Sequence, residues 1–151
     1  MALEPTVSLT QDQIDFYHRE GYLAVDALTS QEEVERLQSI YDRLFASKAG
    51  WEEGNQFDLA GTDDGSEPVL PQVLNPSKYA PELLETQLVA NIRHVGKQLL
   101  GPEAEIGGDH AIRKPARIGA ATPWHQDQAY WDPAFDYENI SVWVPLQPAT
   151  L

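Results

Sequence analysis

The helical hydrophobic pattern of this chain stops at Gly101-Pro102. Before that point, apolar residues recur at three- and four-residue spacing. After it, short extended segments at 104–113, 117–120 and 141–147 are separated by glycine and proline. A run of helices followed by a run of strands is typical of α+β proteins, in which the helices pack on an antiparallel sheet. The sequence therefore predicts an α+β fold.

Helices with an apolar stripe are expected before this change. Gly21 ends the first, and the others are expected over 31–48 and 83–101. Thr29 and Glu32 have the spacing of a capping box at the start of the second helix. We expect the apolar stripes to share one core with the later strands, and residues 141–146 to form a strand buried on both faces.

The segment 49–68 lacks this periodicity and is rich in glycine and acidic residues. Such a composition predicts an exposed loop or lid. Its carboxylates do not have the ligand spacing of an EF-hand, so a solvated acidic loop is favoured over a calcium site.

Composition restricts both the partners and the metal chemistry. The chain has 151 residues, enough for one domain, and carries 24 Asp and Glu against 10 Lys and Arg, a net charge of −14. That charge disfavours nucleic acid and anionic membranes as partners. Cysteine is absent, so any metal must be bound by histidine and carboxylate. No basic leader or long apolar run is present, which is typical of a soluble, cytoplasmic protein.

The segment 122–131 carries the most informative side chains, in the order Thr-Pro-Trp-His-Gln-Asp-Gln-Ala-Tyr-Trp. On an extended chain His125 and Asp127 face the same side, with Gln126 turned away. The two side chains could then bind one cation, and the flanking aromatic residues would surround it with an apolar, water-poor shell. A surface histidine paired with an aspartate is the alternative, because His-x-Asp alone is a common spacing.

The longer sequence 123–131 resembles the metal-binding stretch of the phytanoyl-CoA dioxygenase family. Members are Fe(II)/2-oxoglutarate-dependent oxygenases built on a double-stranded β-helix, a jelly-roll, cupin-like barrel. The expected helices, the Lys114-Pro115 turn and the segment 141–150 follow the family's order, which matches the N-terminal part of its domain. The resemblance implies N-terminal helices packed on a partial jelly roll, within a single domain over 1–151 that is truncated at its C-terminus.

The resemblance also implies roles for particular residues. His125 and Asp127 correspond to the first two members of the iron-binding facial triad. Gln126, Trp143 and Lys114 match positions near the 2-oxoglutarate pocket, although Lys114 could equally be a solvated lysine. The family's second metal-binding histidine and the arginine that binds 2-oxoglutarate lie in strands that would follow this sequence.

The function implied is hydroxylation of a small organic substrate by an oxygenase that uses Fe(II) and 2-oxoglutarate. A carboxylate at Asp127 favours hydroxylation over halogenation, since related halogenases lack it. His110 has no role in this scheme and is interpreted as a core or edge histidine. The alternative is an inactive truncated module that acts through assembly with a partner. An incomplete barrel would leave an apolar edge, so self-association or a complementing C-terminal segment is expected.

Overall fold

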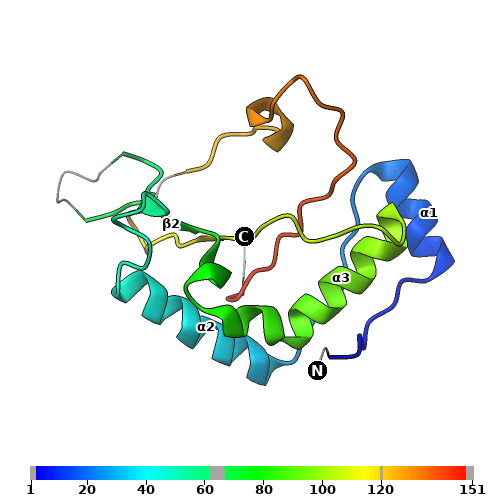
Figure 1. Ribbon diagram of the computed structural model, residues 1–151, viewed down its shortest axis with the longest axis horizontal. Coiled ribbons are helices and arrows are strands. Elements are labelled where there is room, and N and C mark those ends of the chain that lie inside the picture. Colours follow the sequence, from blue (N-terminus) through cyan, green and yellow to red (C-terminus); the bar gives the residue numbers. More distant parts are fainter. Residues whose placement is uncertain (1–2, 62–66, 120, 149–151) are drawn as a thin grey trace.

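The computed structural model describes residues 3–61, 67–119 and 121–148 and has the predicted α+β composition (Figure 1). Among the described residues, no helix has both the length and the apolar character that a membrane span requires. The elements, in chain order, are α1 (Gln11–Glu20), α2 (Gln31–Ala46), β1 (Gln56–Asp58), β2 (Pro71–Leu74), the 3-10 helices η1 (Pro76–Lys78) and η2 (Pro81–Glu85), α3 (Gln87–Leu100), β3 (His110–Ile112) and the 3-10 helix η3 (Asp127–Tyr130).

The helices begin and end where local chemistry requires it. Thr10 caps α1 and forms a capping box with Gln13. Gly21 ends α1 with a φ of 79°, a conformation that glycine adopts without a steric penalty. The cap predicted for α2 was wrong, because Ser30 accepts the hydrogen bond from the amide of Glu33. Serine and threonine are both favoured at the N-cap, and serine somewhat more so, which agrees with the observed cap at Ser30.

The sheet is small and antiparallel, in the order β1-β2-β3. Gln56 of β1 pairs with Val73 of β2, which pairs in turn with Ala111 of β3. Val73 is fully buried at the centre. Among the described residues, only the first of the three extended segments predicted after Pro102 contains a strand, namely β3.

The structure corrects the prediction of an exposed loop over 49–68. Gln56 and Asp58 lie in β1 and are buried. The Asp58 carboxylate accepts hydrogen bonds from the backbone amides of Val69 at 3.0 Å and Leu70 at 2.8 Å. A carboxylate satisfied in this way can be buried, whereas composition alone suggested that it was solvated. Residues 62–66 of the predicted loop lie outside the described residues.

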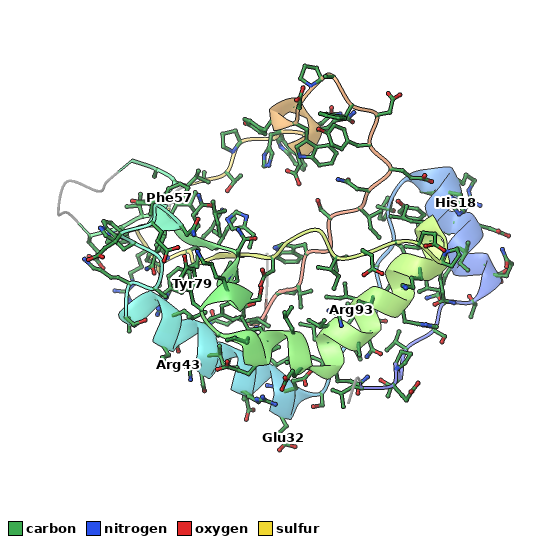
Figure 2. The ribbon with its side chains drawn as sticks, viewed as in Figure 1. His18, Glu32, Arg43, Phe57, Tyr79 and Arg93 are labelled. Carbon is green, nitrogen blue, oxygen red and sulfur yellow. The ribbon has the colours of Figure 1, made fainter. Side chains whose placement is uncertain are left out.

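The core lies between the helices and the extended chain. One cluster is built from α2, η2 and α3, namely Leu37, Ile40, Leu44, Ala80, Leu83 and Leu88. A second contains Leu9, Val95 and Leu99. On α2, Glu32 and Arg43 point away from the extended segments (Figure 2). Together, the helices and the two clusters form the surface on which the later extended chain packs.

The segment 140–148 crosses the middle of the molecule and runs toward α2 and α3 (red in Figure 1). Val144 and Leu146 pack on the first cluster and Ile140 on the second. The prediction of burial on both faces was wrong, because Val142 is 42% and Trp143 77% exposed. Only the face toward the helices has packing partners among the described residues.

Glu33 joins the first turns of α2 and α3. Its carboxylate accepts hydrogen bonds from the backbone amides of Gln87 and Leu88, both at 2.9 Å, and from the hydroxyl of Thr29. Burial acts to raise the pKa of Glu33, but these hydrogen bonds and the charge of Arg36 hold it below its ordinary value. Amides in the first turn of a helix have no partner within the helix, so the carboxylate stabilises α3.

Replacing Glu33 with Gln removes the charge and keeps the side-chain shape. We expect the free energy of unfolding to fall by about 1 to 2 kcal/mol at neutral pH, since hydrogen bonds to a charged acceptor are lost. The lowered pKa means that this contribution is present above the ordinary glutamate value of 4.5 and is lost as the pH falls through the folded-state pKa. Urea unfolding at several pH values measures the difference.

The matched control is Glu32→Gln, which changes an exposed acid in the same turn of α2. Its effect should stay within about 0.5 kcal/mol. An equal loss in both variants, or a Glu33→Gln effect that persists at low pH, would contradict the role given to Glu33.

Candidate metal centre

Residues 121–139 form an exposed arch over the molecule (orange in Figure 1). Every residue of the arch except the half-buried Trp131 is exposed, and its only regular element is η3. Trp124 is fully exposed and Tyr130 is 80% exposed. The water-poor aromatic shell predicted around this segment is therefore absent from the described residues, because no element packs on the outside of these rings.

His125 and Asp127 come together within the arch as predicted. The His125 Nε2 atom lies 3.3 Å from Asp127 Oδ1. The other ring nitrogen, Nδ1, lies 2.8 Å from the backbone carbonyl oxygen of Pro123. A carbonyl can only accept, so Nδ1 carries a proton, and in the neutral form of the ring the lone pair of Nε2 faces the carboxylate. Two lone pairs that face each other repel unless a proton or a metal cation lies between them.

The spacing of these two atoms fits a shared metal ion. Imidazole nitrogen and carboxylate oxygen bind transition metals at about 2.0 to 2.2 Å, so two such donors at right angles lie about 3 Å apart. The observed separation is 3.3 Å. A backbone carbonyl that orients the ring from behind is also a common feature of metal-binding histidines. The donor types and their spacing are therefore compatible with a divalent metal.

Within the described part of the chain, no third donor accompanies the pair. Across the described residues, no group of three or more His, Asp or Glu side chains could hold a metal ion. The second oxygen of Asp127, Oδ2, instead accepts a hydrogen bond from Ser141 at 3.2 Å. Ser141 was not predicted from the sequence, because a serine in an apolar segment gives no signal until its partner is known.

The residues expected near a cosubstrate are distributed around the arch. Gln126 is exposed and directly precedes η3. Trp143 is exposed two residues beyond Ser141. Lys114 lies at the opposite end of the arch, where its Nζ donates to Thr122 Oγ1 at 2.7 Å. Trp143 thus lies on the segment whose Ser141 contacts Asp127, and Lys114 contacts the start of the arch.

His110 lies on β3, at the edge of the sheet. Its ring is hydrogen-bonded to the side chain of Gln72 on β2. Burial lowers the pKa of His110, while the negative charges of Asp109 and Asp127 oppose that shift. The charge of Asp127 in the arch thus acts on His110, which has the edge position expected of it.

An α+β scaffold that presents a His-x-Asp pair in this way defines a candidate mononuclear metal protein. The model of the phytanoyl-CoA dioxygenase (PhyH) family matches residues 17–151, and the chain belongs to that family. This confirms the resemblance seen in the sequence.

Named relatives agree with this assignment. Ectoine dioxygenase from Bordetella parapertussis is 27% identical over 124 residues, 82% of this chain and 39% of the relative. Phytanoyl-CoA dioxygenase from Arabidopsis thaliana is 40% identical over 55 residues, 36% of this chain and 16% of the relative. The chain thus spans well under half of these curated relatives.

Crystal structures of EvdO2 from Micromonospora carbonacea var. aurantiaca are also similar. One matches with a TM-score of 0.66 and 35% identity, and the other, complexed with 2-oxoglutarate, with 0.64 and 32%. Each match covers 87% of this chain and 54% of the EvdO2 chain. The described fold therefore matches about half of the EvdO2 chain.

The hydrogen bond to the Pro123 carbonyl predicts which ring nitrogen of neutral His125 carries the proton. In alkaline buffer without metal, nitrogen-15 NMR should show the proton on Nδ1, the tautomer that is less populated in free histidine. His94 provides an internal reference, because its ring contacts the hydroxyl of Ser8, which can donate or accept. A proton found on Nε2 of His125 would remove the argument that this nitrogen is available to a metal.

Proposed function

We propose that this chain forms the N-terminal part of an Fe(II)- and 2-oxoglutarate-dependent dioxygenase that hydroxylates a small organic substrate. The observation that carries the proposal is the His125–Asp127 pair, with Nε2 and Oδ1 3.3 Å apart and the ring oriented by Pro123. Membership of the family and similarity to a structure complexed with 2-oxoglutarate support it.

His125 and Asp127 would hold the Fe(II) ion. The iron would supply the oxidation of a substrate carbon by O2, coupled to decarboxylation of 2-oxoglutarate. Gln126, Trp143 and Lys114 would line the cosubstrate pocket, with Lys114 able to attract a carboxylate of the cosubstrate. Asp127 favours hydroxylation, since it fills the position that a halide would need.

We propose further that residues outside this sequence complete both the barrel and the site. A third metal ligand and an arginine for the distal carboxylate of 2-oxoglutarate are needed, and arginine suits that carboxylate because it binds in a bidentate manner. The exposed apolar side chains of Ile112 and Trp143 offer a surface for the remaining strands. Self-association through the same surface stays an expectation.

A second candidate is a module without catalytic activity that acts by assembly with a partner. The observation in its favour is that the described residues bring together two metal donors and not three. The two candidates differ in whether the completed protein turns over 2-oxoglutarate.

The isolated chain should bind Fe(II) weakly, through His125 and Asp127. Anaerobic calorimetric titration of His125→Ala and of Asp127→Ala should show an affinity reduced by at least about tenfold, because even loss of an outer-shell partner costs that much. The control is His94→Ala, which removes a half-buried histidine of α3, outside the arch. Parent-like binding by both arch variants would exclude the ligand assignment.

The completed protein, formed by a longer chain or by addition of a complementing segment, should convert 2-oxoglutarate to succinate with Fe(II) and O2. Asp127→Ala should lower the rate of succinate formation by about 100-fold or more, since a metal ligand is lost. Asp136→Asn, an exposed acid in the same arch, should keep the parent rate. Succinate formation undiminished in Asp127→Ala would reject the dioxygenase proposal, and its absence from the parent would favour the non-catalytic module.

A further inference from the structure

We infer that Ser141 is a positioning residue that restricts Asp127 to binding metal through one oxygen atom. The inference rests on the proposed function, in which Asp127 is a metal ligand. Ser141 itself does not touch the reacting atoms. It acts through the orientation of the carboxylate.

The two oxygens of Asp127 have different partners. Oδ1 lies 3.3 Å from His125 Nε2, and Oδ2 accepts a hydrogen bond from Ser141 Oγ at 3.2 Å. An ionised carboxylate can only accept, so the serine hydroxyl must be the donor. The bond to Ser141 therefore fixes the rotation of the carboxylate and directs Oδ1 toward the histidine.

The position of Ser141 is set by the helices. Ile140 packs on the second core cluster and Val144 on the first, while Gln38 of α2 donates to the backbone carbonyl of Leu146. The side chains at 140, 144 and 146 therefore pack on the helices, whereas Ser141 and Val142 are exposed. The packing of residues 140, 144 and 146 holds the backbone of Ser141 in place although its own side chain is exposed.

The bond spans a long stretch of exposed chain. Ser141 and Asp127 are 14 residues apart, and the residues between them belong to the exposed arch. The side chains of Asp127 and His125 are 57% and 42% exposed. The hydroxyl of Ser141 thus ties a metal-binding residue of the arch to the core.

A carboxylate that offers one oxygen occupies one position on a metal. A facial-triad site needs three open positions for its cosubstrate and O2. By engaging Oδ2, Ser141 prevents Asp127 from taking a second position. Ser141 therefore keeps a metal position open for the proposed chemistry, and it also contributes to metal affinity.

Titration with Co(II) followed by NMR tests this inference on the 151-residue chain. Paramagnetic shifts of the His125 ring protons report metal bound at this site even when binding is weak. In Ser141→Ala the affinity should fall by about ten- to 100-fold, the range for loss of an outer-shell partner, and the shift pattern should change as the carboxylate rotates. Ser141→Thr keeps the hydroxyl and should restore both the affinity and the pattern.

Two further variants separate this inference from the proposed function. Ser39→Ala removes an exposed serine of α2 and should bind Co(II) as the parent does, with all serine variants unfolding at the parent's temperature. Loss of the shifts in Asp127→Ala together with parent-like affinity and shifts in Ser141→Ala would overturn the role of Ser141 and leave the ligand assignment intact. Unchanged shifts in Asp127→Ala would overturn both.

Discussion

Packing of the segment 140–146 against α2 and α3 holds the candidate site in place. Ile140, Val144 and Leu146 bury their side chains on the two core clusters, and burial of apolar area is the main favourable term in folding. The arch before this segment is exposed along nearly its whole length. Because Ser141 belongs to this packed segment and bonds to Asp127, its packing on the helices helps to position a side chain of the exposed arch.

The carboxylates of Asp58 and Glu33 form hydrogen bonds within the fold. Asp58 binds backbone amides beside β1, and Glu33 binds the first amides of α3. In both cases backbone amides take the place of water as hydrogen-bond donors, which lowers the free-energy cost of burying the charge. A net charge of −14 therefore overstates how much of the acidic content faces solvent.

The candidate site offers two donors of the kind that the proposed metal centre needs. His125 and Asp127 supply an imidazole nitrogen and a carboxylate oxygen at a spacing that suits one ion, and Pro123 and Ser141 orient them from behind. The match to EvdO2 covers 54% of that chain, so the similarity extends over about half of the EvdO2 structure. Local geometry and the extent of the match thus lead to the same proposal.

The sequence by itself determined the α+β class, the existence of the helices and the closeness of His125 and Asp127, because periodicity, caps and residues two apart on an extended chain are local properties. It placed the third helix at 83–101, whereas η2 covers Pro81–Glu85 and α3 begins at Gln87. It missed β1 and β2, and it missed the exposure of Trp143, since these depend on which distant segment supplies a partner. It also missed Ser141, whose role exists only once α2 and α3 bring its strand-like segment beside Asp127. Tertiary structure decided these features because hydrogen bonds and burial between residues far apart in the chain are not encoded in any one window of sequence.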